Sequence, residues 1–286
     1  MRVLVFSTTG QVARELARGA EGRGITLTAL GRDAADLTDP EACAAAVMAS
    51  DVDVVINAAA HTAVDRAETE PDLARVINAE APGAMARAAA ARGMPFLHVS
   101  TDYVFDGRPG RAWREDDTPV PLSVYGATKL AGERAVIDSG GRAAILRPAW
   151  VFSAHGTNFV KTMLRVGAAG RELRVVEDQR GGPTAAADIA GALLTMAAAL
   201  ADGRGAPGVF HFSGAPVVSW ADFAEAIFAA RGGPGPVVER IPSSAWPVPA
   251  ERPKNSALDC SRIAEAYGIA QPDWRPRLVE VIGELT

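Results

Sequence analysis

The amino-acid sequence predicts an α/β fold in which a doubly wound parallel sheet is followed by a smaller C-terminal lobe. Short apolar and β-branched runs alternate with alanine-rich segments of helical length in the first half of the chain, as in βαβ units. Residues 52–56 and 96–99 are apolar almost throughout, which is typical of strands that helices cover on both faces. With 286 residues and 48% hydrophobic content, the chain is long enough to bury a large core.

The alternation predicts the elements in order. We expect strands near residues 2–6, 25–30, 53–57, 95–99 and 143–147, and helices near residues 11–21, 40–50, 70–92 and 124–139. Further on, we expect a helix near 157–168, a strand at 173–176 and a helix near 184–201, and proline and glycine then dominate 231–253. We therefore expect residues 1–150, joined by parts of 171–205, to form the sheet domain, and residues 151–286 to form mainly the smaller lobe.

Composition argues against several classes of protein. The net charge is −5 and no basic run is present, so we expect no nucleic-acid partner. The apolar stretch 189–201 is shorter than the roughly 20 residues that a membrane helix needs. Because a strand begins at once after Met1, we expect no leader peptide, no membrane partner and a cytoplasmic location.

The cysteines and histidines do not predict a metal site. Cys43 and Cys260 are far apart in the sequence, and the four histidines lack metal-ligand spacing. We expect two packed thiols in a reducing compartment and no catalytic metal.

The loop after the first strand has the spacing of a dinucleotide-binding loop. It reads Ser-Thr-Thr-Gly-Gln-Val-Ala over residues 7–13, with serine at the first glycine position and alanine at the last. Gly10 is where a side chain would most obstruct a pyrophosphate, and the next helix offers backbone N–H groups. Ser7 must adopt a turn that glycine enters more easily.

The end of the second strand discriminates between cofactors. Arg32 follows Leu30 and Gly31 where a carboxylate would bind the ribose of NADH. Arginine pairs with a 2′-phosphate, so we expect NADPH and keep NADH as the alternative; a solvated surface arginine is the other interpretation. Next come Asp36 and Leu37, placed to contact adenine, while Thr38 or Asp39 is better placed to cap the next helix.

Small residues follow the third strand. Ala58, Ala60, His61 and Thr62 come after Asn57, and small side chains allow the nicotinamide half of a cofactor to pass closely over the strand end. Tight helix packing is the competing explanation of the alanines.

One further motif suggests proton transfer. Tyr125 and Lys129 lie four residues apart on a predicted helix, so they project from one face. A nearby ammonium lowers the pKa of a phenol from about 10, and we expect Lys129 to make Tyr125 a general acid or base in this way. Thr101 and Asp102 at the end of the fourth strand strengthen this interpretation, although such a pair also occurs by chance in helices.

Taken together, these motifs resemble the extended short-chain dehydrogenase/reductases and, more narrowly, the dTDP-4-dehydrorhamnose reductase family. The resemblance covers nearly the whole chain and rests on eight segments: Thr9–Val12, Asn57–Glu68, Val99–Gly107, Pro121–Glu133, Arg147–Phe152, Asn158–Met163, Asp178–Thr184 and Arg252–Ser256.

The resemblance implies roles for individual residues. It implies a Rossmann-type NADP-binding domain and a substrate-binding lobe. The implied catalytic set is Thr101, Tyr125 and Lys129. The implied cofactor-binding set is Gly10, Gln11, Val12, Arg32, Asp36, Leu37, Ala58, Ala60, His61 and Thr62, with Tyr125 and Lys129. The implied substrate-binding set is Thr101, Asp102, Trp150, Asn158 and Asn255.

The implied reaction is reduction of the C4 carbonyl of dTDP-4-dehydro-6-deoxy-L-mannose by NADPH. Related 4,6-dehydratases carry Thr-Asp-Glu, whereas Tyr103 follows Asp102 here, which favours reduction over elimination. Other nucleotide-sugar chemistry, such as epimerisation, and a non-catalytic NADP-binding regulatory subunit remain the alternatives, and the nucleotide base is open.

Some family members dimerise through Mg²⁺ held by acidic side chains. Glu15 matches one such position, but Ala187 occupies a neighbouring one and leaves mainly Asp188. We therefore do not expect the metal, and we expect a monomer or a homodimer.

Overall fold

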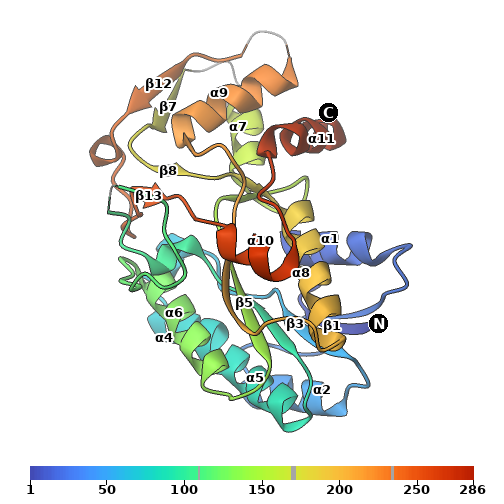
Figure 1. The fold of residues 1–286 in the computed structure, drawn as a ribbon. Coiled ribbons are helices and arrows are strands. Elements are labelled where there is room, and N and C mark those ends of the chain that lie inside the picture. The colour runs from blue at the N-terminus through green and yellow to red at the C-terminus, as the bar shows by residue number, and fades with distance from the viewer. Residues whose placement is uncertain (109, 169–171, 233–234) are drawn as a thin grey trace.

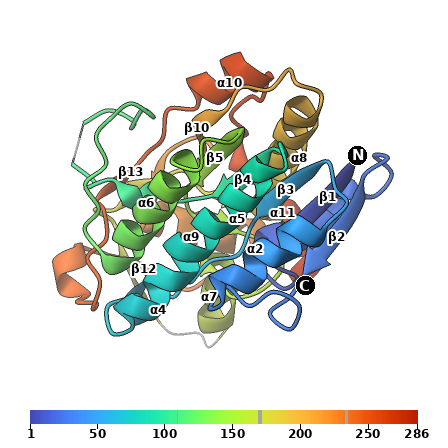
Figure 2. The ribbon, with the colours of Figure 1, turned by 90° about the horizontal axis from the view of Figure 1, so that it is seen from below.

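A six-stranded parallel sheet forms the centre of the molecule (Figures 1 and 2). The computed structural model describes residues 1–108, 110–168, 172–232 and 235–286, so residue 171, the first of a segment expected beside the sheet, lies outside them. The strand order is β10-β5-β4-β3-β1-β2, and every neighbouring pair is parallel. The strands are β1 (Arg2–Phe6), β2 (Thr26–Leu30), β3 (Val54–Asn57), β4 (Phe96–Val99), β5 (Ala143–Pro148) and β10 (Gly208–Phe212).

The first five strands lie where the sequence predicts them, which confirms the α/β fold class. The sixth, β10, was not predicted. It follows a loop at 202–207 that contains glycine and proline, and its partner β5 is more than fifty residues away in the chain. No local pattern identifies that pairing.

Helices cover both faces of the sheet. They are α1 (Gln11–Ala20), α2 (Pro40–Ala49), α3 (Val64–Ala67), α4 (Pro71–Arg75), the π-helical turn η1 (Val76–Glu80), α5 (Ala81–Ala91), the 3₁₀ turn η2 (Asp102–Val104), α6 (Val124–Ile137) and α8 (Ala186–Ala201). Helices α1 and α8 pack together on one face, and α2 and α5 pack together on the other, where α6 lies next to α5 (Figure 2). Alternate strand residues enter the two cores: Val3 and Val5 face α1 and α8, whereas Leu4 and Phe6 face α2 and α5. This two-sided burial explains why the strands are apolar almost throughout.

A smaller lobe lies beyond the carboxyl ends of the strands (Figure 1). Its elements are β6 (Val151–Phe152), α7 (Phe159–Gly167), β7 (Leu173–Val176), β8 (Arg180–Gly181), β9 (Thr184–Ala185), β11 (Val218–Ser219), α9 (Trp220–Arg231), β12 (Val238–Ile241), the 3₁₀ turn η3 (Ser243–Ala245), β13 (Asn255–Ser256) and α11 (Trp274–Leu285). Helix α10 (Ser261–Tyr267) instead packs against β10 and α8 of the sheet domain. Strand β7 was expected to serve either part of the molecule, and it pairs with β12. Helix α9 packs on both strands and on α7 and α11.

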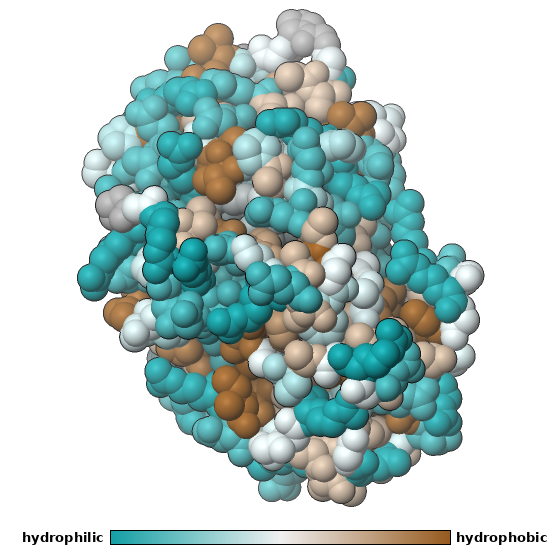
Figure 3. Space-filling model, viewed as in Figure 1, coloured by the Kyte–Doolittle hydropathy of each residue, from teal (hydrophilic) through white to brown (hydrophobic). Residues whose placement is uncertain are grey.

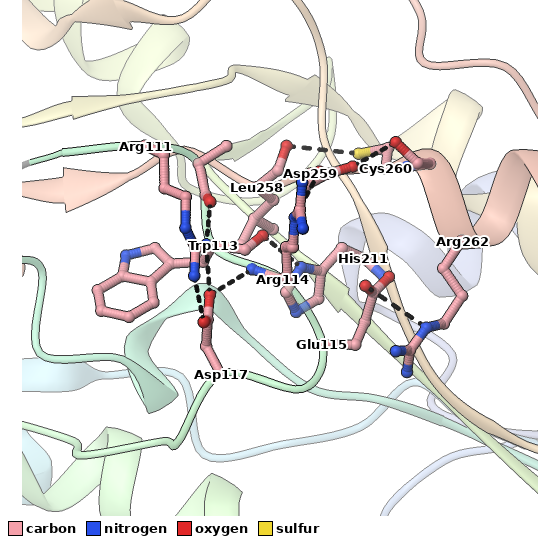
Figure 4. Close-up of polar contacts among 12 residues, drawn as sticks. Arg111, Trp113, Arg114, Glu115, Asp117, His211, Leu258, Asp259, Cys260 and Arg262 are labelled. Atoms are coloured by element: carbon pink, nitrogen blue, oxygen red, sulfur yellow. Dashed lines mark hydrogen bonds and ion pairs between the residues drawn. The ribbon is translucent and has the colours of Figure 1, made fainter.

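The segment between η2 and α6 ties the C-terminal residues to the sheet (Figure 4). The Trp113 N–H donates to Ala257 O at 2.8 Å, and the Arg114 and Asp259 side chains pair at 3.3 Å. The nearly buried Glu115 carboxylate accepts from the backbone N–H of His211 on β10 at 3.0 Å and lies 3.7 Å from the Arg262 guanidinium. Charged groups therefore hold the last strand of the sheet against α10.

The outer surface is mainly polar. On the face shown in Figure 3, hydrophobic residues form separate small groups among hydrophilic ones. Cys43 and Cys260 are both buried free thiols, as the sequence predicts. Within the described residues, no helix combines the length and the apolar character needed to cross a membrane.

Helix α6 lies unusually close to its neighbours because it carries two glycines. A Cβ at Gly126 would lie 2.2 Å from Tyr103 O, and a Cβ at Gly132 would lie 2.0 Å from Asn78 O. The Ser123 hydroxyl caps the helix by accepting from the Gly126 N–H. The glycines therefore set how near α6 comes to η1 and η2.

A buried ion pair fixes the same helix to the sheet. Arg147 of β5 binds Glu133 of α6 in a bidentate manner, at 2.8 and 2.6 Å, and both side chains are at most 3% exposed. Ser100, at the end of β4, also donates to Glu133. Breaking such a pair leaves an uncompensated buried charge.

We predict that Gly132→Ala lowers the free energy of unfolding by about 3 kcal/mol, because the added methyl group meets backbone that cannot move aside. The matched control is Gly191→Ala in α8, where no described atom lies within 4 Å of the new Cβ and alanine should stabilise by about 0.5–1 kcal/mol. Urea unfolding measures both. Equal effects would show that α6 does not depend on the close approach.

We predict that Arg147→Met costs about 3–5 kcal/mol of unfolding free energy, because Glu133 is left unpaired in the core. Adding Glu133→Gln should recover part of that loss, giving a coupling energy of about 2 kcal/mol. The exposed pair Arg204–Asp202 serves as the control and should contribute less than about 1 kcal/mol. Additive losses in the double variant at residues 133 and 147 would contradict the pairing.

Candidate active site

A cavity of about 960 Å³ opens at the carboxyl ends of the strands. Its wall includes residues that follow β1, β2, β3 and β4, together with residues of the smaller lobe. Strands β2 and β3 flank β1 on opposite sides, so the chain reverses its winding direction there. Open parallel sheets bind ligands at this kind of switch point.

The loop between β1 and α1 forms one end of the cavity. Ser7 has a φ of 125°, a region that favours glycine, so it adopts the strained turn that the sequence predicts. Its hydroxyl accepts from the Gly10 N–H at 3.2 Å. Gly10, Gln11 and Val12 line the cavity, and α1 has no side-chain cap among the described residues. The first N–H groups of α1 are thus free for an anion.

Gln11 connects this loop to the smaller lobe. Its Oε1 accepts from Ser153 Oγ at 2.8 Å and from Asn158 Nδ2 at 2.9 Å. Asn158 lines the cavity and also caps α7 by accepting from the Lys161 N–H at 3.1 Å. The Asn158 side chain therefore caps α7 and contacts Gln11 whether or not it also binds a ligand.

The second strand brings Arg32, Asp36 and Leu37 to the cavity. Arg32 is largely exposed, with its Nε 3.9 Å from Asp36 Oδ2. The Thr38 N–H donates to Asp36 at 2.9 Å and holds the pKa of that carboxyl below its usual value. Asp39 caps α2 by accepting from the Ala42 N–H, which agrees with one of the two caps that the sequence allows.

The residues after β3 form the floor of the cavity. Ala58, Ala60, His61 and Thr62 all line it. A residue that the sequence did not single out, Asn78 of η1, holds this segment: its Oδ1 accepts from the His61 N–H at 2.8 Å and its Nδ2 donates to His61 O at 3.2 Å. The same amide also donates to Thr128 Oγ1 of α6 at 3.1 Å.

Tyr125 and Lys129 lie on the buried face of α6, with exposures of 9% and 1%, and both line the cavity. Tyr103 packs edge-on against Tyr125 with ring centroids 5.7 Å apart. The Lys129 amine donates to Val99 O at 2.7 Å and lies 3.2 Å from His98 Nε2. The helical spacing thus puts both side chains on the face of α6 that lines the cavity, as the sequence predicts.

Burial changes the acidity of both groups. It raises the pKa of Tyr125 to about 12, although hydrogen bonding with Thr101 acts in the opposite direction. Burial lowers the pKa of Lys129 to about 8, against the effect of Glu133. The expected lowering of the Tyr125 pKa by Lys129 is therefore wrong, because burial dominates and the amine is directed to Val99 O and His98 and is itself desolvated.

Thr101 and Asp102 follow β4 and line the same wall. The Thr101 hydroxyl donates to Asp102 Oδ1 at 3.0 Å and accepts from the Tyr103 N–H at 3.2 Å. Asp102 Oδ2 is buried and makes no hydrogen bond of ordinary geometry among the described residues, although the nearby hydroxyls of Ser256 and Thr101 both act to lower the pKa of the carboxyl. Burial raises the pKa of Asp102 to about 6. A buried carboxyl oxygen without a hydrogen bond lowers the stability of the fold, unless a ligand donates a hydrogen bond to it.

Aromatic side chains form another part of the cavity wall. Trp150, with a φ of 47°, stacks on Trp220 at a centroid distance of 3.5 Å. Phe159 packs against Trp220 at 4.5 Å, and Phe223 completes the group. All four line the cavity. Sequence analysis identified Trp150 only, because the helix that carries Trp220 is distant in the chain.

Asn255 is the one candidate that does not line this cavity. Its Nδ2 donates to Arg111 O at 3.0 Å and to Arg108 O at 3.3 Å, and its Oδ1 accepts from the Ala257 N–H. These bonds hold the segment before α6. A substrate-binding role for Asn255 stays a prediction.

Glu15 and Asp188, the acidic residues considered for a metal, contact basic side chains instead. Glu15 lies 3.3 Å from His155 Nε2, and Asp188 binds Arg277 at 2.8 Å. In the part of the chain that the structure describes, no group of three or more His, Cys, Asp or Glu side chains is arranged to hold a metal ion.

Comparison with known proteins identifies the family. The family model described as "RmlD substrate binding domain" matches residues 1–286. A dTDP-4-dehydrorhamnose reductase of Burkholderia thailandensis is 45% identical over 96% of each chain. The crystal structure of a dTDP-4-dehydrorhamnose reductase of Clostridium acetobutylicum superposes with a TM-score of 0.93 at 36% identity, covering 100% of this chain and 99% of that one.

The dTDP-4-dehydrorhamnose reductase of Bacillus anthracis, solved in complex with NADP, superposes with a TM-score of 0.92 at 31% identity, covering 99% of each chain. Both the sequence and the whole fold are thus shared from end to end. The chain belongs to the RmlD family, the family of the dTDP-4-dehydrorhamnose reductases.

Proposed function

We propose that this chain reduces the C4 carbonyl of dTDP-4-dehydro-6-deoxy-L-mannose with NADPH to give dTDP-L-rhamnose, the last step in the biosynthesis of that sugar nucleotide. The relatives at 36–45% identity are named for this activity. The observation that carries the proposal is that Thr101, Tyr125 and Lys129 line one cavity whose far end is the N terminus of α1. A nucleotide-binding end and a proton-donating end are thus joined in one site.

The residues present fit a phosphorylated dinucleotide. Free N–H groups at the start of α1 suit a pyrophosphate, and a Cβ at Gly10 would lie only 2.9 Å from Ser7 Oγ. Arg32 offers an exposed cation for the 2′-phosphate, and we propose that Asp36 and Leu37 contact the adenine. Ala58, Ala60, His61 and Thr62 would line the nicotinamide side. When bound, NADPH supplies the hydride.

Tyr125 supplies the proton. Its pKa of about 12 keeps the hydroxyl protonated at neutral pH, so it can donate to the carbonyl oxygen as negative charge develops there. The Thr101 hydroxyl, rotated away from Asp102, donates a second hydrogen bond to that oxygen. Lys129 would bind the nicotinamide ribose, and the proton that Tyr125 gives up is resupplied through the ribose and water after each turnover.

The sugar nucleotide occupies the other half of the cavity. Asp102 Oδ2, buried and without a hydrogen bond of ordinary geometry among the described residues, accepts from a sugar hydroxyl. Trp150 offers an aromatic face to the sugar ring, braced from behind by Trp220. Asn158 and Asn255 are proposed to reach the diphosphate or the base.

Tyr103 makes elimination of water less suitable. Burial raises the pKa of its hydroxyl, so this residue is a poor substitute for the glutamate base of the related dehydratases. Reduction needs no base at that position. The sequence at Thr101–Tyr103 therefore favours carbonyl reduction.

We also propose the setting in which the enzyme works. Residues 1–150, with parts of 171–205, act as the NADP-binding domain, and residues 151–286 act mainly as the substrate-binding lobe. The enzyme acts in the cytoplasm as a monomer or a homodimer. Two reduced, buried thiols suit a reducing compartment.

We predict that the purified chain consumes NADPH when the dTDP-linked keto-sugar is added, and that Tyr125→Phe lowers kcat by about 10²–10⁴-fold with NADPH affinity nearly unchanged. The absorbance of NADPH measures turnover. Tyr267→Phe, which removes a hydroxyl bonded to Ala206 O outside the cavity, should keep normal kcat. Tight NADPH binding without any turnover by the wild-type chain would instead indicate a binding module.

We predict that Arg32→Ala weakens NADPH binding by about 10-fold or more, because a charge-assisted hydrogen bond is worth about 1.5–3 kcal/mol, and leaves NADH binding unchanged. Titration of both cofactors measures the difference. Arg23→Ala, an exposed arginine in the turn after α1, is the charge-matched control. Equal losses for the two cofactors would remove Arg32 from phosphate recognition.

A further inference from the structure

A buried chain of polar side chains lies beneath the cavity and ends at Lys129. Asn57 and His98, at the ends of β3 and β4, have no exposure to solvent. Asn57 Nδ2 lies 3.2 Å from His98 Nδ1, and His98 Nε2 lies 3.2 Å from Lys129 Nζ. Because the imidazole lies between two nitrogen groups, its proton position is tied to theirs.

The orientation of Asn57 is fixed by the backbone. Its Oδ1 accepts from the Ala59 N–H at 3.0 Å. Exchanging the amide oxygen and nitrogen would place the NH₂ group against that N–H and leave a buried donor unsatisfied, which is costly. Asn57 therefore presents its NH₂ group, a donor, to His98 Nδ1.

Only one state of His98 suits this neighbour. With a donor facing it, Nδ1 must carry the lone pair, so the neutral ring carries its proton on Nε2. In the other tautomer and in the imidazolium, Nδ1 would carry a proton, and this N–H donor would face the NH₂ donor of Asn57. The complete burial of the ring also disfavours the imidazolium.

The Nε2–H group then faces the Lys129 amine. An ammonium has three donors and no acceptor, so it could not accept a hydrogen bond from Nε2–H. A neutral amine offers its lone pair to Nε2–H and still donates to Val99 O. We propose that Asn57 and His98 are positioning residues that favour the neutral amine of Lys129 over the ammonium before NADPH binds, so that NADPH binding is accompanied by uptake of a proton at Lys129.

The surrounding charges are compatible with this state. The charged and titratable groups on the neighbouring elements are His98 on β4; Arg147 on β5; Asp102 and Tyr103 on η2; Asp65 and Arg66 on α3; Asp72 and Arg75 on α4; Glu80 on η1; Arg87 on α5; and Tyr125, Glu133 and Arg134 on α6 itself. Glu133 is the acidic group that favours the ammonium. Its charge is already balanced by the bidentate contact with Arg147.

The inference rests on the proposed function, because it assumes that the cavity takes NADPH. A polyanionic ligand favours the charged form of an amine in the same cavity. Because His98 Nε2–H is itself a donor, the ammonium formed when Lys129 takes up a proton directs its N–H groups to Val99 O and to the cavity. Ligand binding thus creates the cation where the ribose is proposed to lie.

The first test examines the ligand-free wild-type chain by ¹⁵N NMR of its imidazole nitrogens. We expect His98 to show an unprotonated Nδ1 and a protonated Nε2 throughout the range in which the chain is folded. An Nδ1–H tautomer, or an imidazolium, would overturn the proposal. This test needs neither a variant nor a cofactor.

The second test uses Asn57→Asp, which is isosteric but replaces the donor with an acceptor. The carboxylate still accepts from Ala59 N–H, and it should move the His98 proton to Nδ1, so that Nε2 accepts from a charged Lys129. Asn78→Asp is the matched control, because it also adds a carboxylate at a buried asparagine but leaves the contacts of His98 in place. Its His98 tautomer should be that of the wild type.

Calorimetry of NADPH binding in buffers of different ionisation enthalpy then counts the protons taken up. At pH 8.5 an amine with a pKa of about 8 is about three-quarters neutral, so we expect uptake approaching that fraction in the wild type and at least about threefold less in Asn57→Asp, as a rise of one pKa unit would give. Tight binding without uptake in the wild type, or equal uptake in both, would overturn the proposal. Failure to bind NADPH would count against the proposed function, and the NMR result would still decide the inference.

Discussion

The buried contact between Glu133 and Arg147 determines where the reactive groups of this protein lie. Tyr125, Lys129 and Glu133 follow one another at intervals of four residues, so they share one face of α6. A helix with one carboxylate bound bidentately to a strand cannot rotate without breaking that bond in the core. Fixing Glu133 against β5 therefore also fixes the phenol and the amine above β4. Ser100 contributes to the same contact, so the strand end that carries Thr101 is held by it too.

The residues with strained backbone conformations lie on the cavity wall. Ser7 and Trp150 are the two non-glycine residues with positive φ among those described, and both line the cavity. Such conformations cost on the order of 1–3 kcal/mol each and persist only where the surroundings enforce them. At Ser7, the hydroxyl bond with the Gly10 N–H supports the turn. At Trp150, stacking on Trp220 holds the side chain. The rest of the fold thus stabilises two conformations whose effect is to shape the site.

Sequence reasoning was accurate where the determinants are local. The first five strands, the long helix through 71–91 and the helical face of Tyr125 and Lys129 follow from periodicity and spacing. Interactions between distant segments could not be predicted: β10 joins the sheet only through pairing with β5, and Asn78 gains its role from contacts with residues 61 and 128. The prediction that the pKa of Tyr125 is lowered was wrong because that pKa, too, depends on the surrounding fold. Spacing on a helix showed that an ammonium was near, but not that burial would dominate or where the amine would point.

The titratable groups of the site share one tendency. Burial shifts Tyr125, Lys129, Asp102 and His98 each toward the uncharged form, because a desolvated charge is unfavourable unless it is paired. Any charge that these groups carry is therefore poorly solvated, in contrast to the fully paired charges of Glu133 and Arg147 beneath them. Charge enters with the phosphates of the ligands and develops again on the carbonyl oxygen during reduction. In a desolvated site each of these charges acts strongly on its neighbours. Burial therefore keeps the phenol protonated at rest, and the oxyanion that forms beside it is what draws the proton off.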